Sequence, residues 1–324
     1  MPPPGDFKNR KTGLVVFGIL TLLMGGLCAL FVPLMFFGQA MSEKTAGVHQ
    51  SPEAILPAIM VYGLLAVSLV WLGIGSIMAR RWARALLLIF SWSWLVTGVI
   101  SLAVMAAMAP HLMEAMRATG RPGQPELPPA ANLIILLITA VMMGVIFLVL
   151  PGVWVFFYGS KHVKATCETC DPVERWTDRC PLPVLALSLC LALGTLTSLV
   201  MPLPYHGVFP FFGVFLTGLP GTLAWVALAA VWGYSARALY KLDGLGWWLA
   251  LVSFILLAIS NVITYSRHDI TELYRLMHYP EEKIAQIRQF GFFEGGAMAW
   301  LTLLCMVPWI GYLLYVRKFF RRDA

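Results

Sequence analysis

Charged side chains are scarce in this chain of 324 residues, where Asp, Glu, Lys and Arg together make up only 12% of the sequence. Soluble globular domains carry about 25% charged residues, so the composition excludes a water-exposed globular surface. A mean hydropathy of +0.78 and a hydrophobic share of 59% point the same way. The chain is therefore predicted to be a multi-pass membrane protein.

Ionisable side chains are also absent from the interiors of eight long apolar runs. No Asp, Glu, Lys, Arg or His lies well inside a run, and Glu294 comes nearest, at the outer entrance of the last one. Carriers that are coupled to protons or ions need such groups within the membrane. We therefore expect any transport by this protein to proceed without ion coupling through buried charges.

Motifs for catalysis and nucleotide binding are missing as well. The sequence contains no glycine-rich phosphate loop, no HExxH, no nucleophile elbow and no facing pair of carboxylates. We expect no enzymatic activity, and no cofactor is required by the sequence. The net charge of +7 does not indicate a nucleic-acid partner, because the basic residues flank the apolar runs, where the lipid bilayer accounts for them.

The apolar runs are each long enough for a helix that crosses a bilayer, which takes about 20 residues. They cover residues 13–38, 54–78, 83–109, 131–158, 182–201, 213–239, 245–265 and 293–316. A backbone in lipid must satisfy its own hydrogen bonds, and the runs lack the alternation of a barrel. The predicted fold class is an all-α integral membrane protein with eight transmembrane helices.

Lysine and arginine are distributed unequally between the two sides of this topology. Of the 23 Lys and Arg residues, 16 fall on the side of both termini. The seven on the outer side are Lys44, Arg117, Arg121, Arg267, Arg275, Lys283 and Arg288. Because cytoplasmic loops carry the excess of basic residues, both termini are predicted to be cytoplasmic, in a cell inner membrane. The turn GSIMARRWAR resembles cytoplasmic turns of bacterial membrane proteins, which implies topology alone.

The two halves of the sequence show an internal repeat. A shift of 157 residues superposes Arg80 on Arg237, Arg84 on Lys241 and Pro151 on Pro308. Four spans restore the starting side of the membrane, so the repeats are parallel. We predict two tandem four-helix repeats, residues 1–158 and 184–324, joined by a cytoplasmic connector at 159–183.

Two long outer segments, 110–130 and 268–292, are the predicted places for a protein partner to dock. Asp269 and Glu272 have capping-box spacing, and a stripe of apolar residues follows, which predicts a short interfacial helix. The alternative is that these segments only cover the helix ends at the membrane surface.

The connector contains the spacing H-x4-C-x2-C-x9-C, formed by His162, Cys167, Cys170 and Cys180. Two thiolates spaced as C-x2-C can hold one tetrahedral zinc ion, but a second tight pair is missing. Three interpretations are open: a structural zinc site, a redox dithiol, or reduced cysteines without a ligand.

Histidines on the outer side suggest a second metal site. His49 and His206 are related by the shift of 157, as are His111 and His268. Neutral imidazole is a common ligand of transition metals and haem iron, and methionines nearby would suit Cu(I). The alternative is structural hydrogen bonding at the helix ends.

A substrate path is predicted from Gly218, Pro220 and Gly221, together with Glu294. The glycines and the proline could break the sixth span and free backbone groups for a ligand, although the start of a helix would use the same residues. The expected function is small-molecule transport or a channel-like permease. The alternatives are a non-catalytic scaffold, sensor or assembly subunit, and an outer-face metal- or haem-binding protein.

Overall fold

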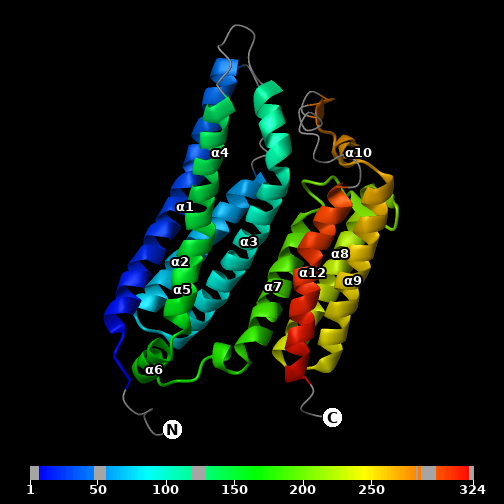
Figure 1. Ribbon diagram of the computed structural model, residues 1–324. Helices are drawn as coiled ribbons and strands as arrows, with labels where there is room; N and C mark the ends of the chain where they lie inside the picture. The colour runs from blue at the N-terminus through cyan, green and yellow to red at the C-terminus, as the bar shows by residue number, and fades with distance from the viewer. Residues whose placement is uncertain (1–6, 47–55, 119–128, 282–283, 286–296, 321–324) are drawn as a thin grey trace. The chain divides into compact units, whose positions relative to one another are not determined.

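The computed structural model describes residues 7–46, 56–118, 129–281, 284–285 and 297–320 (Figure 1). Within these ranges, eight helices are long and apolar enough to cross a membrane. The predicted class, an all-α multi-pass membrane protein, is confirmed at this level. The arrangement as two tandem repeats stays a prediction.

The elements follow the chain in a simple order. They are α1 (Lys11–Ala46), α2 (Leu56–Ile77), α3 (Arg81–Ala118), α4 (Pro129–Gly144), the π-helix η2 (Val145–Val149), α5 (Leu150–Gly159), α6 (Lys161–Cys170), the 3-10 helix η3 (Trp176–Asp178), α7 (Leu182–Val200), β1 (Phe209–Phe211), β2 (Val214–Leu216), α8 (Gly218–Tyr240), α9 (Gly244–Arg267), α10 (Ile270–Leu276), α12 (Ala297–Val316) and the 3-10 helix η4 (Arg317–Phe319). The predicted fourth span is built from α4, η2 and α5.

Large apolar side chains point outward from the spanning helices. Phe156 is 85% exposed, Trp300 74% and Val67 70%, and they belong to α5, α12 and α2. Contiguous apolar surface of this kind is not stable in water, whereas the hydrocarbon core of a bilayer covers it without cost.

The chain folds as two compact units. Unit 1 consists of residues 1–94 and 150–182, and unit 2 consists of residues 95–149 and 183–324. Most of the predicted connector, up to Leu182, therefore packs with the first set of helices. Helix α3 and the fourth span each contribute residues to both units.

Small residues bring α1 and α2 of unit 1 into close contact. A Cβ placed on Gly18 would lie 2.9 Å from the Gly73 carbonyl oxygen, and one placed on Gly25 would lie 3.0 Å from the Val70 nitrogen. Helices in lipid associate mainly through such close packing, because lipid and side chains are equally apolar.

Buried hydroxyl groups connect α5 to the α1–α2 pair. The Tyr158 hydroxyl lies 2.7 Å from Ser76 Oγ, and Ser76 Oγ donates a 3.0 Å hydrogen bond to the Leu14 carbonyl. Trp154 Nε1 donates to Thr21 Oγ1 at 3.4 Å. Tyr158 and Ser76 are at most 1% exposed, so these groups have the protein partners that burial requires.

The connector is more ordered than its polar sequence suggests. Ser160 caps α6 by accepting a hydrogen bond from the His162 backbone N–H. The N-terminal segment lies against this helix, since the Arg10 backbone N–H donates to Thr166 Oγ1 at 3.1 Å. We call this end of unit 1, which holds the α2–α3 turn and α6, the turn end.

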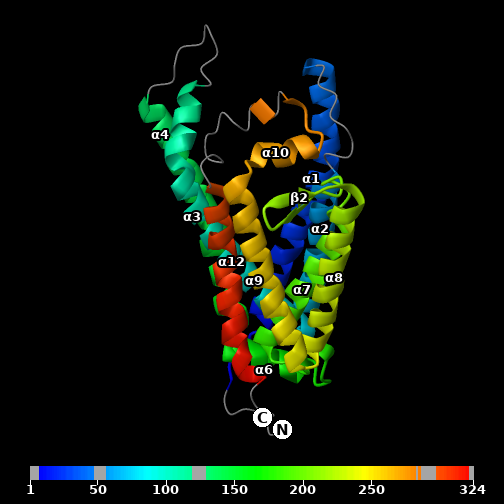
Figure 2. The same ribbon diagram turned by 90° about the vertical axis from the view of Figure 1, so that its right-hand side faces the viewer.

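The sixth span starts later than predicted. Residues 213–216 are part of the predicted span because they are apolar, but together with residues 209–212 they form the hairpin β1–β2 (Figure 2). Its two-residue turn has Phe212 at φ 41° and Gly213 at φ 93°, the positive values that tight hairpins require. Helix α8 then begins at Gly218.

The short helix predicted after Asp269 is present as α10, and its place at the membrane interface stays a prediction. It follows α9 directly, and its Ile270 and Leu273 are buried in a cluster with Val208 and Met277. Asp269 accepts a hydrogen bond from its neighbour Thr271 Oγ1 at 3.0 Å instead of capping the backbone. Hairpin β1–β2 and α10 lie at the same end of unit 2, which we call the cap end (Figure 2).

Candidate functional site

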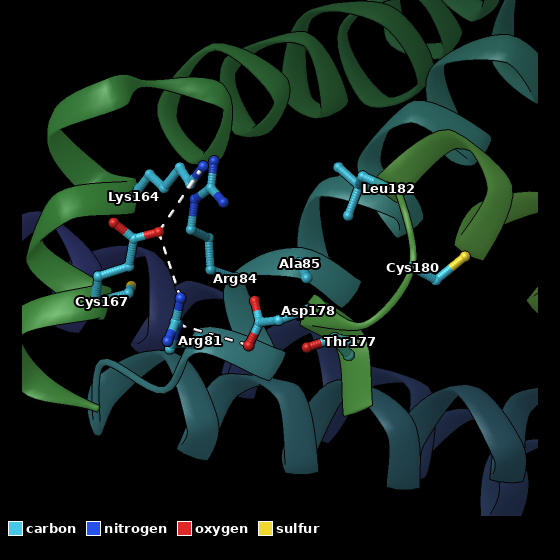
Figure 3. Close-up of a pocket in the computed structure, with 10 residues that line it drawn as sticks. Arg81, Arg84, Ala85, Lys164, Cys167, Thr177, Asp178, Cys180 and Leu182 are labelled. Atoms are coloured by element: carbon cyan, nitrogen blue, oxygen red, sulfur yellow. Dashed lines mark ion pairs between the residues drawn. The ribbon is translucent and has the colours of Figure 1, made fainter. Parts of the chain in front are cut away.

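A polar pocket of about 280 Å³ lies at the turn end of unit 1 (Figure 3). The side chains come from the start of α3, from α6, from η3 and from the residues that lead to α7. They are Arg81, Arg84, Ala85, Lys164, Cys167, Glu168, Thr177, Asp178, Cys180 and Leu182. A single water needs about 10–15 Å³ by a comparable measure, so the pocket has room for a small ligand.

Arg81 connects the walls of this pocket. Its Nη2 lies 3.5 Å from Glu168 Oε1 on α6, and its Nε lies 3.6 Å from Asp178 Oδ2 on η3. Lys164 Nζ lies farther from Glu168 Oε1, at 3.8 Å. Both carboxylates of the pocket are therefore engaged by Arg81, and Lys164 is held only loosely.

Arg84 and Thr177 carry polar atoms that are buried without a protein partner. Arg84 Nε and Thr177 Oγ1 have no hydrogen bond in the part of the chain that the structure describes, and Thr177 is 3% exposed. No carboxylate among the described residues forms an ion pair with Arg84. A buried donor left unpaired costs about 1–3 kcal/mol, so these two atoms are candidates for hydrogen bonds to a bound water or to a small ligand.

A second cluster of charges fastens the end of α6 to the α2–α3 turn. Asp171, 2% exposed, accepts hydrogen bonds from Arg175 Nη2 at 3.0 Å and Nε at 3.4 Å. Arg80 Nη1 lies 3.6 Å from the same carboxylate. The Arg175 guanidinium, against the opposing effect of burial, lowers the pKa of Asp171, so the carboxylate stays ionised and keeps the pocket walls in place.

No three of the four connector residues predicted as metal ligands are grouped in the described part of the chain. Cys167 and Cys180 are both buried and both line the pocket, whereas Cys170, on the same helix as Cys167, is exposed. His162 Nδ1 accepts a hydrogen bond from the Lys8 backbone N–H at 3.4 Å. Within the described ranges, no three His, Cys, Asp or Glu side chains are grouped in a way that could hold a metal ion.

Burial also affects the ionisation of the two cysteines that line the pocket. Burial raises the pKa of Cys167 to about 12 and that of Cys180 to about 11. In the protein without a metal ion these two thiols are therefore protonated at neutral pH, and neither is activated as a nucleophile.

Of the four histidines predicted as ligands on the outer side, the structure describes the side chains of His206 and His268. His49 and the side chain of His111 lie outside the described residues. His206 packs edge-on against His278, with ring centroids 5.3 Å apart, and not against His268. His278 was not among the predicted ligands, because its partner is set by two turns, in which His206 and His278 both have positive φ.

His268 forms a bridge within the cap end of unit 2. Its Nδ1 lies 2.7 Å from Glu272 Oε2 on α10, and its Nε2 lies 3.0 Å from the Gly213 carbonyl oxygen in the hairpin turn. Both partners are acceptors, so the protonated ring satisfies both contacts. Glu272 and, to a smaller extent, the Gly213 carbonyl raise the pKa of His268, while the nearby Arg267 opposes them.

We expect the cap end to become less stable as the pH rises. Because the pKa of His268 is raised in the folded protein, its contacts stabilise the cap end fully at a pH below the ordinary pKa of about 6.5. This stabilisation is lost as the pH rises through the raised pKa. The rate of hydrogen exchange of the β1–β2 amides should increase between about pH 6 and pH 8 by more than the intrinsic exchange rate increases over the same range. Glu272→Gln should flatten this dependence, whereas Glu281→Gln, which removes the carboxylate paired with Arg275, should leave it unchanged. Equal pH dependence in all three proteins would contradict the role of His268.

The residues predicted to form a substrate path have a structural role where the structure describes them. Gly218, with φ 63°, begins α8, and Pro220 and Gly221 lie in its first turn. The helix is therefore not broken within the span at these positions, and they correspond to the alternative reading as a helix start. Glu294 lies outside the described residues.

In the sequence, Arg80, Arg81 and Arg84 indicated the topology, and Arg80 and Arg84 also indicated the internal repeat, but none of them indicated the pocket. Arg84 and Thr177 are far apart in the chain, and no spacing relates them. One signal in the sequence could have indicated the contact between the connector and α3. Asp178 is an acidic residue in the polar connector, and it can pair with the basic start of α3, where Arg81 lies.

Comparison with family models, with curated protein sequences and with solved structures gave no match.

Proposed function

We propose that this chain is a non-catalytic membrane sensor or assembly subunit that binds an anionic ligand at the turn end of unit 1. The observation that carries this proposal is the pocket in which Arg84 Nε and Thr177 Oγ1 are buried without a partner among the residues that the structure describes. Binding is favoured over thiol-based catalysis because burial raises the pKa of Cys167 and Cys180, the two cysteines that line the pocket.

The location proposed for this pocket is the cytoplasmic face of a cell inner membrane. The support is the excess of Lys and Arg on the side of both termini, which includes the residues of the α2–α3 turn. A ligand would then reach the pocket from the cytoplasm or from the inner leaflet. An assembly partner would use the cap end or the segment 110–130.

The proposal is tested by native mass spectrometry of the full-length protein purified in a mild detergent. We expect the wild-type chain to carry a bound small molecule or lipid that is absent from Arg84→Met. Lys241→Met is the matched control, because it removes a basic residue at the repeat-related position and should retain the bound mass. A ligand that is retained by Arg84→Met, or no ligand on the wild type, would refute a binding role for this pocket.

Small-molecule transport is the alternative, and one feature of the fourth span favours it. Pro151 lacks the N–H that would bond to the Phe147 carbonyl, and the preceding turn is the π-helix η2. A Cβ on Gly98 would collide with that carbonyl oxygen, so α3 and η2 meet backbone to backbone in the middle of their spans. Such π-helical segments often mark functional sites. Solute uptake by proteoliposomes, abolished in Gly98→Leu, would favour this alternative.

A further inference from the structure

The pocket presents donors from three different elements. Arg84 enters from α3, Lys164 from α6 and Thr177 from η3, as the close-up shows (Figure 3). A carboxylate offers its two oxygens in one plane, whereas a phosphoryl group presents three acceptor oxygens in different directions. A ligand that engages three donors from separate walls needs acceptor oxygens in several directions, which is the geometry of a tetrahedral oxyanion.

The charges of the pocket fit such an ion. Three cations, Arg81, Arg84 and Lys164, face two carboxylates, those of Glu168 and Asp178. Arg81 pairs with both carboxylates and so offsets their repulsion of an anion. Arg84 then provides the uncompensated positive charge, and Lys164 can turn from Glu168, 3.8 Å away, toward a ligand.

The position of the pocket limits the source of the ligand. Arg84 lies in the first turn of α3, at the end of a membrane-spanning segment, where headgroups of the bilayer and soluble ions both have access. Basic pockets at this depth are known to hold anionic lipid headgroups. A volume of about 280 Å³ accepts a phosphate group together with part of the group esterified to it.

We propose that the pocket binds a phosphoryl group, carried by an anionic phospholipid or by a soluble phosphate monoester. This inference rests on the proposed function and specifies the chemistry of its ligand. Arg84 and Lys164 would neutralise the phosphoryl charge, which is about −1.5 to −2 for a monoester at neutral pH. The Thr177 hydroxyl would donate to a third oxygen.

The test uses the full-length protein in phosphate-free buffer and two kinds of probe. Calorimetric titration with glycerol 3-phosphate measures the soluble source, with succinate as the carboxylate control. Nanodiscs of phosphatidylcholine, alone or with phosphatidic acid, measure the lipid source through the melting temperature of the protein.

The variants are Arg84→Met, Thr177→Val and the control Lys241→Met. Thr177→Val keeps the shape of a side chain whose hydroxyl has no protein partner, so folding should be preserved.

We expect glycerol 3-phosphate or phosphatidic acid to bind the wild type, and the one that binds identifies the source. Arg84→Met should weaken binding roughly ten- to hundredfold and Thr177→Val roughly two- to tenfold, while Lys241→Met should not change it. Equal binding of succinate, or unchanged phosphate binding in both pocket variants, would overturn the phosphoryl assignment. If neither phosphate probe binds but the wild type retains an Arg84-dependent mass in native mass spectrometry, this inference fails and the proposed function stands. If neither probe binds and no Arg84-dependent mass is found, both the phosphoryl assignment and the proposed function are refuted.

Discussion

Gly221→Ala should destabilise unit 2 by about 3 kcal/mol, which is the upper end of the range of about 1–3 kcal/mol that overpacking typically costs. A Cβ at this position would overlap the Gly207 carbonyl oxygen and would lie 2.7 Å from the Leu216 carbonyl oxygen. Both neighbours are backbone atoms, and Gly207 itself has φ 70°, so no side-chain rotation can relieve the clash. The expected measurement is a lower thermal unfolding midpoint in detergent, with faster proteolysis near β1–β2.

The control for this substitution is Gly244→Ala. Gly244 is also in the first turn of a helix, α9, but a Cβ there would meet no atom within 4 Å. Alanine is the better helix former, so this variant should be neutral or gain at most about 1 kcal/mol. Equal unfolding midpoints for the two variants would show that the contact with Gly207 is not a tight one.

Asp171→Asn should destabilise the turn end of unit 1 by about 2 kcal/mol. The substitution keeps the shape of the side chain but removes the charge that holds Arg175 and Arg80. Their side chains are 37% and 35% exposed, so water partly compensates and the loss is smaller than for a fully buried pair. Thermal unfolding in detergent and protease resistance of residues 160–180 are the measurements.

The same carboxylate gives the turn end an acid limit. The pKa of Asp171 is lowered in the folded protein. The ionised carboxylate therefore stabilises the turn end at a pH above the ordinary pKa of about 3.9, and this stabilisation is lost as the pH falls through the lowered pKa. Wild-type protein should therefore lose stability on acidification through that range, and Asp171→Asn should lose less. Glu174→Gln, a change at an exposed acid of the same connector, should behave like the wild type. Identical acid profiles for Asp171→Asn and wild type would contradict the assignment.

The sequence by itself determined the membrane class, the eight spans and the helix α10. Each follows from local information: runs of about 20 apolar residues must become helices in lipid, and a capping residue followed by an apolar stripe predicts a short amphipathic helix. These features need no knowledge of which distant residues meet.

Tertiary structure alone decided the hairpin, the histidine contact and the pocket. Residues 209–216 are as apolar as a span, and only pairing of Phe211 with Val214 distinguishes the hairpin from the start of a helix. His206 meets His278 because two left-handed turns face one another, which no periodicity predicts. Arg84 and Thr177 line one pocket because Arg81 and Asp171 draw the connector back onto α3 and its preceding turn. Charges attract through space without regard to chain distance, so the site could be seen only after the chain had folded.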